Sequence, residues 1–348
     1  MENSSNPFNK VKTSRVILPA FIGLGVVAYI FHKEFDPAIF DRITFTWTSV
    51  LWMFVAVLCM AGRDIGYMIR IRVLSDWKLN WRQAFRVIML WEFTSAVTPS
   101  SIGGTSVALL YVHKEGISVG RSSAIVMVTS LLDELYFVIM FPLLILLTGA
   151  GKLFAIPDAP GWAHGIMTLA LIGYSLKLIW VLVLSYGLFF NPRGLSRLIY
   201  RIFHLPVLCR WKRGAAKAAV DITVTSAEMK SKKPKFWFNA FLSTFLSWTS
   251  RYWVVNFMFL AFFAIHDHFL IFARQLVMWI VLLVSPTPGG SGVAEFMFDK
   301  FLGGFIPIAG FAIALALLWR LITYYPYLVI GTLLVPKWIN DKFTSKRK

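Results

Sequence analysis

Two glycine-rich runs, TPSSIGGTSVA at 98–108 and PTPGGSGVA at 286–294, hold residue types that could bind an anion. A Gly-Gly pair permits a tight chain reversal, and a Ser or Thr after it can cap a helix that begins there. The first turn of such a helix has free amide groups and carries the positive end of the helix dipole. We therefore predict anion-binding helix ends, with candidate residues Gly103, Gly104 and Thr105 in the first run and Gly289, Gly290 and Ser291 in the second. Ordinary turns between spans, or glycine-rich helix packing, are the alternative interpretation.

Two arginines, Arg251 and Arg320, interrupt otherwise apolar stretches. An arginine at the centre of a membrane helix costs about 2.5–3.5 kcal/mol on insertion scales, so each should face a partner or a wet cavity. The forked donors of a guanidinium fit phosphate oxygens bidentately. Glu295, which follows the second run, could hold an arginine in place or accept a cationic headgroup. Tyr324 follows Arg320 and completes this group of candidate binding residues.

Three further acidic residues, Glu92, Asp133 and Glu134, lie inside apolar stretches and are secondary candidates. A structural ion-pair network is the alternative role for Glu92 and Asp133. Adjacent residues on a helix, such as Asp133 and Glu134, point about 100° apart, which argues against joint acid chemistry. Lys177 and Arg274 are expected to snorkel or to lie at the membrane interface.

The composition excludes an ordinary soluble enzyme. Of 348 residues, 57% are hydrophobic and 15% are charged, against about 45–50% and about 25% in soluble domains. Two cysteines and six scattered histidines predict neither a disulfide framework nor a metal site, and no cofactor is expected. Because no catalytic motif is present, we expect a protein that is not an enzyme. These features predict an all-α polytopic membrane protein.

Six stretches are apolar and long enough to cross hydrocarbon, which takes about 20 residues. They lie near 16–31, 43–62, 122–151, 160–190, 236–265 and 302–335. Two more, near 84–112 and 270–297, are broken at the glycine-rich runs and predict re-entrant helical hairpins. We expect about six full transmembrane helices plus two hairpins, arranged as an inverted repeat of 16–190 and 236–336. Eight full spans are the alternative, which would move the basic segment 113–121 to the other side.

The formal charge of +18 is concentrated on one predicted side of the membrane. The basic segments are 1–15, 63–86, 113–121, 191–235 and 337–348. By the positive-inside rule this side is cytoplasmic, and both termini lie there, in a bacterial or archaeal cytoplasmic membrane. The whole chain, 1–348, is expected to be one membrane domain whose two halves are joined by the linker 191–235.

The linker is predicted to contain a basic amphipathic helix that lies on the anionic cytoplasmic leaflet. Its apolar residues Leu195, Leu198, Ile199, Ile202 and Phe203 fall on one helical face. A charge run that only directs topology is the alternative. Nucleic acid is not an expected partner, because these basic residues adjoin membrane spans.

The first Gly-Gly motif, the run PTPGGSGVAE at 286–295, and Arg320 followed by Tyr-Tyr-Pro and Gly331 resemble the membrane region of lysylphosphatidylglycerol synthetases. They also resemble the related stand-alone flippase-like proteins, over roughly residues 15–335. The resemblance implies a region that binds lipids and passes them between leaflets, while a separate soluble domain transfers the amino acid. Aminoacyl transfer by this chain is therefore not implied. The chain has Leu-Leu-Asp-Glu at 131–134, where many relatives would show an arginine near the acidic residue.

These observations favour a transporter that binds an anionic or modified lipid between the two hairpins and moves its headgroup across the bilayer. The glycine pairs would present helix ends to a phosphate, Arg251 and Arg320 would neutralise it, and Glu295 would orient them. The lipid could be an anionic phospholipid, an aminoacylated lipid or a polyprenyl-phosphate-linked glycolipid. The main alternative is a protein that holds such a lipid for a separate glycosyl- or aminoacyl-transferase without translocation. An intramembrane enzyme that uses Asp133 or Glu295 is a third, weaker hypothesis.

Overall fold

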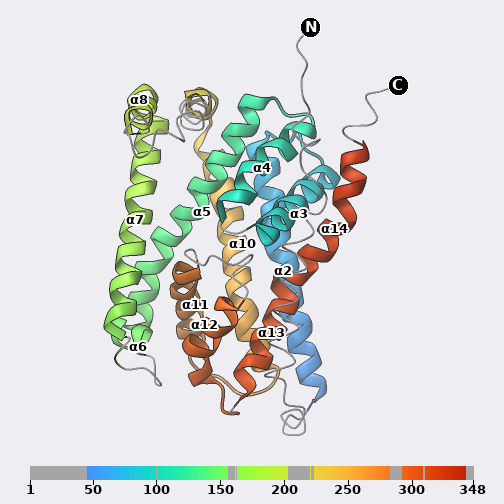
Figure 1. The fold of residues 1–348 in the computed structure, drawn as a ribbon, viewed down its shortest axis with the longest axis vertical. Helices are drawn as coiled ribbons and strands as arrows, with labels where there is room; N and C mark the ends of the chain where they lie inside the picture. The colour runs from blue at the N-terminus through green and yellow to red at the C-terminus, as the bar shows by residue number, and fades with distance from the viewer. Residues whose placement is uncertain are drawn as a thin grey trace.

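The regular structure is helical throughout the part of the chain that the computed structural model describes (Figure 1). That part comprises residues 45–98, 101–155, 163–202, 223–282, 292–308 and 310–341, with Gly161 and Val220. The helices are α2 (Trp47–Leu74), α3 (Trp81–Val97), α4 (Ser101–Lys114), α5 (Val119–Thr148), α6 (Ala150–Phe154), α7 (Ala163–Phe189), α8 (Pro192–Ile202), α10 (Pro234–Leu260), α11 (His268–Leu282), α12 (Val293–Leu302), α13 (Phe311–Thr323) and α14 (Tyr325–Ile339). The predicted all-α membrane fold is confirmed.

Four of the six predicted spans form helices that are long and apolar enough to cross a membrane. They are Trp47–Leu74, Val119–Thr148, His164–Phe189 and the combined α13 and α14, Phe311–Ile339. The fifth predicted span forms α10, whose 27 residues extend about 40 Å, although it is less apolar than those four. The first predicted span, near 16–31, lies outside the described residues. The number of crossings therefore stays a prediction.

The two halves of the described chain repeat one order of elements in opposite directions (Figure 1). In the first half α2 rises, α3 and α4 pack together at the upper end, and α5 descends. In the second half α10 descends, α11 and α12 pack together at the lower end, and α13 and α14 rise. This arrangement is the one that an inverted repeat predicts.

The paired helices of each half are too short to cross a bilayer one by one. They have 17 and 14 residues in the first half and 15 and 10 in the second. At 1.5 Å per residue these lengths are about 15–26 Å, less than the ~30 Å of hydrocarbon. Their insertion as re-entrant hairpins stays a prediction that these lengths favour.

Helices α2 and α10 pack closely and antiparallel (Figure 1). Gly66 of α2 lies against α10, where an added Cβ would be 2.9 Å from the carbonyl oxygen of Ser243 and would clash with Ser247. At Gly62, one turn earlier, an added Cβ would be 3.5 Å from Ser250 Oγ. Small residues spaced four apart let helix backbones approach closely within a membrane.

The sixth predicted span is interrupted after Arg320. Helix α13 ends at Thr323, Tyr324 has φ −131°, and α14 begins at Tyr325. Pro326 lacks a backbone N–H and fits the first turn of a new helix. Helix α14 then packs on α3, where Gly331 meets the ring of Phe93.

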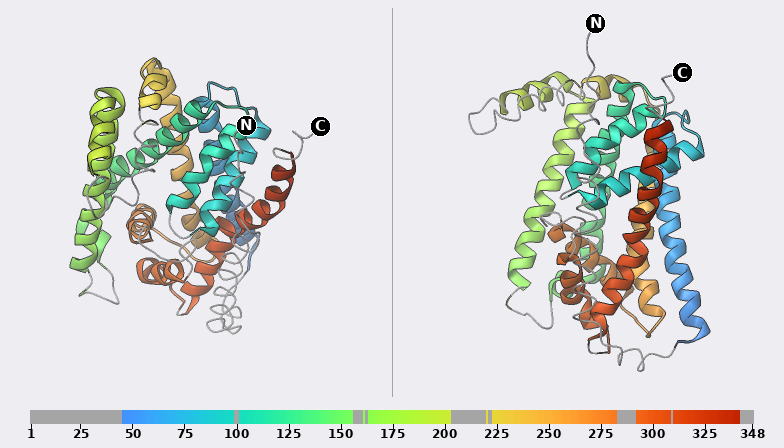
Figure 2. Two further views of the ribbon diagram at one scale, coloured as in Figure 1. Left: turned by 45° about the horizontal axis from the view of Figure 1, so that its top comes forward. Right: turned by 45° about the vertical axis from the view of Figure 1, so that its right-hand side comes forward.

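Part of the predicted linker forms the amphipathic helix α8, which lies across the end of α7 (Figure 2). Leu195 is buried in a small apolar cluster with Leu184 and Leu188 of α7, whereas Arg193 and Arg197 are exposed. Residues 203–219 of the linker lie outside the described residues. Of the predicted apolar face, Leu195 is buried against α7, and the contact of α8 with the leaflet stays a prediction.

One predicted boundary is wrong. The second span was expected to end at residue 62, with Arg63 and Arg70 in a basic segment outside the membrane. Instead α2 continues to Leu74, and the side chains of Arg63 and Arg70 are buried. The physical reason is that both arginines find carboxylate partners on other helices, which offset the cost of burying them.

Candidate functional site

Arg63, Tyr67 and Arg70 form a ladder on one face of α2. The spacing of four and three residues places them on successive turns. The guanidinium groups lie over the Tyr67 ring at 4.7 Å for Arg63 and 4.6 Å for Arg70. The sequence analysis did not identify these residues. Their helical spacing within a run that stays largely apolar to Leu74 is the signal that could have found them.

Arg63 joins α2 to α3 and α14 through a buried ionic cluster. Its guanidinium contacts Asp64 at 2.9 Å and Glu92 of α3 at 2.6 Å, and it is only 2% exposed. Tyr327 of α14 donates its hydroxyl to both oxygens of Asp64, at 2.9 and 3.0 Å. Glu92, a secondary candidate, therefore lies in an ion-pair network, the alternative role that the sequence analysis left open.

Arg70 makes the corresponding link between α2, α5 and α10. It forms an ion pair with Asp133 of α5 and donates to Thr244 Oγ1 of α10 at 3.2 Å. Asp133 also accepts a hydrogen bond from the Trp248 indole at 2.7 Å. Asp133, too, thus takes the structural role that was the alternative to lipid binding.

Asp133 and Glu134 point to different neighbours, as their adjacent positions on a helix predict. Glu134 forms an ion pair with Lys177 of α7, and the Lys177 ammonium lies 4.8 Å from the centre of the Phe137 ring. The expectation that Lys177 snorkels to the interface is wrong, because its side chain is buried against this carboxylate. The ion pair supplies the counter-charge that snorkelling would otherwise seek in water.

Arg274 of α11, which was expected to snorkel or to lie at the membrane interface, is buried within the protein. It donates to the carbonyl of Phe301 at 3.0 Å and to the carbonyls of Lys152 and Ala155 at 3.1 and 2.5 Å. Carbonyl groups at helix C-termini have no partner within the helix. Arg274 therefore ties the ends of α6 and α12 together, and this explains its burial.

Glu295 and Arg320 lie together, as the sequence analysis hypothesised. Glu295 Oε1 accepts a hydrogen bond from Arg320 Nε at 2.9 Å, and Oε2 accepts one from the Gly292 amide at 2.6 Å. Both side chains are buried. The carboxylate thus sits at the positive end of α12, where it is favoured by the helix dipole. It occupies the helix end that was expected to face a lipid phosphate.

A continuous chain of contacts joins this pair to the first hairpin. The Arg320 guanidinium lies 4.5 Å from the centre of the Tyr324 ring, and the Tyr324 hydroxyl donates to the carbonyl of Ala96 at 2.9 Å. Ala96 lies in the last turn of α3, and Glu295 lies in the first turn of α12. The inner ends of the two hairpins are therefore connected through Arg320 and Tyr324.

The first glycine-rich run contributes packing at Gly104. An added Cβ there would lie 3.0 Å from Ser95 Cα and would clash with the Ser95 hydroxyl, so the glycine lets α3 and α4 approach closely. Gly103 is the third residue of α4, so its amide is among those at the helix start that lack a partner within the helix. Gly104 is the fourth residue, and its amide lies one position beyond that group. Thr105 also lies in α4. Gly289, Gly290 and Ser291 of the second run lie outside the described residues.

Arg251 of α10 lies apart from these ion pairs. Its guanidinium is 5.9 Å from the centre of the Trp248 ring and 5.3 Å from that of Trp279. It borders a pocket between α10, α11 and α13, whose lining residues are Arg251, Tyr252, Gln275, Met278, Trp279, Leu282 and Trp319. Sequence analysis identified Arg251 but not the aromatic walls, which come from three separate helices.

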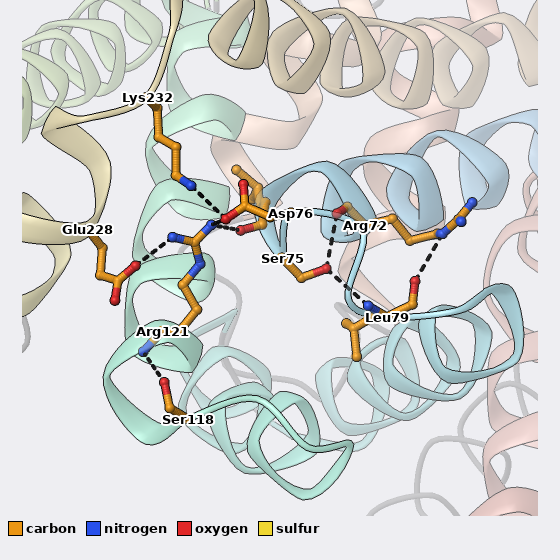
Figure 3. Close-up of polar contacts among 9 residues, drawn as sticks. Arg72, Ser75, Asp76, Leu79, Ser118, Arg121, Glu228 and Lys232 are labelled. Atoms are coloured by element: carbon orange, nitrogen blue, oxygen red, sulfur yellow. Dashed lines mark hydrogen bonds and ion pairs between the residues drawn. The ribbon is translucent and has the colours of Figure 1, made fainter.

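A second polar cluster lies at the end of the bundle where α2 stops (Figure 3). Arg121 of α5 is buried between Glu228 at 2.6 Å and Asp76 at 2.8 Å, and it also donates to the carbonyl of Leu74 at 2.7 Å. Lys232 reaches Asp76 at 2.6 Å. These contacts fasten the helical segment 223–230 to α2 and α5. They were not predicted, because every member had been assigned to a solvated basic segment or left out.

The site can orient and neutralise charge, and no cofactor was predicted for it. In the described ranges no group of three or more His, Cys, Asp or Glu side chains is arranged to hold a metal ion. The carboxylates of Asp64, Glu92, Asp133 and Glu134 are 21–24% exposed, whereas their cationic partners are more deeply buried. Each buried cation is thus held by an acid that retains some access to its surroundings.

Comparison with known proteins agrees with this architecture. A family model described as the lysylphosphatidylglycerol synthase TM region matches residues 16–331. A UPF0104 membrane protein of Archaeoglobus fulgidus is 24% identical over 343 residues, which cover 94% of this chain and 98% of that protein. No solved structure matches the chain. The chain is a multi-pass membrane protein that belongs to the family of the lysylphosphatidylglycerol synthase transmembrane region.

Proposed function

We propose that the protein binds the phosphate-bearing headgroup of a membrane lipid between its two helical hairpins and moves that headgroup between leaflets. The chain of contacts from Glu295 through Arg320 and Tyr324 to the carbonyl of Ala96 carries the proposal. It brings the inner ends of two oppositely inserted hairpins to one place in the bundle. Interrupted helices from inverted repeats meet in this way at the central sites of many membrane transporters.

Ion pairs within the helical bundle also support the proposal, because they keep charged side chains inside the membrane-spanning region. A path for a charged headgroup needs polar side chains inside the membrane, and such side chains persist when they are paired. Arg63, Arg70, Lys177 and Arg320 are each paired with a carboxylate on the same or a neighbouring helix. A headgroup that competes for one of these pairs could shift the packing of the helices that the pair joins.

The charge distribution supports a cytoplasmic position for the end of the bundle that carries α8. Arg193 and Arg197 of α8 and Lys337 near the end of α14 lie at that end (Figure 1). The positive-inside rule assigns such an end to the cytoplasm. Helix α8 would then rest on the anionic leaflet, and the segments 1–15 and 337–348 would lie on the same side.

A leaflet-transfer assay tests the proposal. The full chain is reconstituted into vesicles with fluorescent phosphatidylglycerol, and a membrane-impermeant quencher is added outside. We expect quenching beyond the outer-leaflet fraction, and we expect Tyr324→Phe, which removes the hydrogen bond to Ala96, to slow transfer by roughly threefold to tenfold. Transfer no faster than in protein-free vesicles would contradict the proposal.

The same vesicles separate transport from the alternative of binding alone. Parallel reactions contain a labelled aminoacylated phosphatidylglycerol or a labelled polyprenyl-phosphate glycolipid. Saturable binding of one lipid with no transfer would favour a protein that holds the lipid for a separate transferase. Transfer of one lipid and not of the others would identify the transported class.

A further inference from the structure

Arg251 differs from the other cations in the middle of the described helices. Arg63, Arg70, Lys177 and Arg320 each contact a carboxylate, and Arg274 contacts three backbone carbonyls. For Arg251 the described residues supply only the rings of Trp248 and Trp279. A guanidinium in an apolar span needs a partner or a wet cavity, and Arg251 is partly exposed, so its donors are accessible to a ligand.

The neighbouring tyrosine gives a second, independent observation. Tyr252 lines the same pocket, is 4% exposed, and has a hydroxyl without a hydrogen-bond partner among the residues that the structure describes. Buried hydroxyl groups nearly always have partners, because an unmade hydrogen bond costs more than a made one gains. The hydroxyl and the guanidinium of Arg251 are therefore two unused donors beside one pocket.

The walls of the pocket determine what kind of ligand fits. Trp279 and Trp319 give it aromatic sides, and Met278 and Leu282 add apolar surface. Aromatic pockets often hold organic cations, but the positive charge of Arg251 excludes a cation. The pocket has an internal volume of about 10 Å³, which is room for one oxygen-sized group. An anion on an apolar body fits this space if one of its oxygens enters the pocket and the rest of the ligand lies at the rim.

We infer that this pocket between α10, α11 and α13 binds the phosphate group of a lipid, with Arg251 and Tyr252 as its donors. The inference rests on the proposed function, since it assigns a receiving site for the same headgroup. Arg320 then serves as a positioning residue, because Glu295 occupies its Nε and also the end of α12. The lipid could be a phospholipid or a polyprenyl phosphate, since both offer this chemistry.

Two contacts keep the pocket in shape without ligand. Trp248, one of the two rings beside Arg251, is held by its indole hydrogen bond to Asp133 at 2.7 Å. Gln275 donates to the carbonyl of Tyr252 at 2.9 Å, which ties α11 to α10 next to the free hydroxyl. Trp248 and Gln275 are therefore held in place by hydrogen bonds within the protein and help to position the donors.

The test measures lipid affinity of the detergent-purified full chain by native mass spectrometry. The probes are phosphatidylglycerol, undecaprenyl phosphate and phosphatidylcholine. We expect tighter binding of phosphatidylglycerol or undecaprenyl phosphate than of phosphatidylcholine, and a loss of roughly tenfold or more in Arg251→Met and in Tyr252→Phe. The probe that loses affinity in both variants identifies the source of the phosphate.

Tyr136→Phe is the matched control for Tyr252→Phe. The Tyr136 hydroxyl is hydrogen-bonded to Thr249 at 3.2 Å, away from the pocket lining. This control should keep lipid affinity and lower the melting temperature, whereas Tyr252→Phe should lose affinity and keep its melting temperature. If the Tyr252 hydroxyl had only a structural role, Tyr252→Phe would lower the melting temperature and leave lipid affinity unchanged, as expected for Tyr136→Phe.

Unchanged affinity in both Arg251→Met and Tyr252→Phe would overturn the inference, as would equal affinity for phosphatidylcholine. If Arg251→Met fails to fold, Tyr252→Phe alone decides, because removing an unpaired hydroxyl should not destabilise the fold. Leaflet transfer by the wild-type chain with unchanged affinity in the variants would leave the proposed function standing without this pocket. Lost affinity in the variants without any wild-type transfer would support the pocket and contradict transport.

Discussion

Helices α2 and α10 pack side by side, and each carries arginine within its length. Arg63 and Arg70 of α2 meet carboxylates from α3 and α5, Glu92 and Asp133. The arginine of α10, Arg251, meets tryptophan rings and the edge of a pocket. The comparison separates two settings for a cation within a helix: Arg63 and Arg70 are buried and paired with carboxylates, whereas Arg251 is partly exposed and packs on aromatic rings.

Neighbouring helices account for this difference. The face of α2 that carries Arg63 and Arg70 adjoins acids on other helices. The face of α10 that carries Arg251 adjoins α11 and α13, which contribute Gln275, Trp279 and Trp319. Removing one member of a buried pair leaves an uncompensated charge. Stability should therefore depend on the α2 arginines far more than on Arg251.

The largest expected effect is that of Arg63→Met. The substitution leaves Asp64 and Glu92 without their cation, and it should lower the free energy of unfolding by about 3–5 kcal/mol. Denaturant titration of the detergent-purified protein, followed by tryptophan fluorescence, measures the change. Arg251→Met is the matched control on α10 and should stay within about 1 kcal/mol of wild type. Similar losses in the two variants would erase the distinction between paired and open arginines.

A somewhat smaller loss is expected for Lys177→Met, because it leaves Glu134 unpaired in the interior. We expect a decrease of about 2–4 kcal/mol in the free energy of unfolding. The double variant Lys177→Met, Glu134→Met should recover most of it, since both charges are then replaced by apolar groups. The same titration measures both variants. A double variant as unstable as the single one would mean that the pair does more than balance charge.

Close packing of α2 on α10 predicts a loss of about 1–3 kcal/mol for Gly66→Ala, because the new methyl group meets the backbone oxygen of Ser243. Gly62→Ala, one turn away on the same helix, has space for a methyl group and should change stability little. Thermal unfolding in detergent compares the two. Equal melting temperatures of the two variants would show that α2 and α10 can shift to admit the methyl group at Gly66 at no cost in stability.

The smallest effect is expected at the end of the bundle, for Glu228→Gln. Arg121 keeps Asp76 and the carbonyl of Leu74, and Glu228 is 41% exposed, so the loss should be below about 1 kcal/mol. The difference should shrink further at high salt, because exposed ion pairs are screened. Melting temperatures at low and high ionic strength measure this. A loss as large as that of Lys177→Met would place this cluster with the buried pairs.

The hydrophobic pattern predicted much of the fold because a membrane helix must satisfy its backbone internally and present apolar side chains. The boundary after residue 62 failed for a specific reason. Arg63 and Arg70 look like residues at the end of a span when they are seen without partners. Glu92 and Asp133, which make their burial possible, lie 29 and 63 residues further along the chain.

For the candidate site, too, the sequence predicted some features and missed others. Glu295 and Arg320 were predicted from residue type and from the position of Glu295 directly after the second glycine-rich run, and they lie together. The hydrogen bonds by which Glu295 closes the end of α12, and the packing of Gly104 on Ser95, depend on which helices meet. Neither contact could be predicted from the residue types alone.

From the sequence alone, composition and charge determined a helical membrane protein with two interrupted segments and a strongly basic side, because those features depend on transfer to hydrocarbon and on local backbone chemistry. The tertiary structure decided which buried charges are paired and which one faces a pocket. That outcome depends on contacts between α2, α5, α10 and their neighbours, and electrostatic energies in a membrane change steeply over a few ångströms. Arg70 and Arg251 are the same residue type on adjacent helices, and only their neighbours distinguish them.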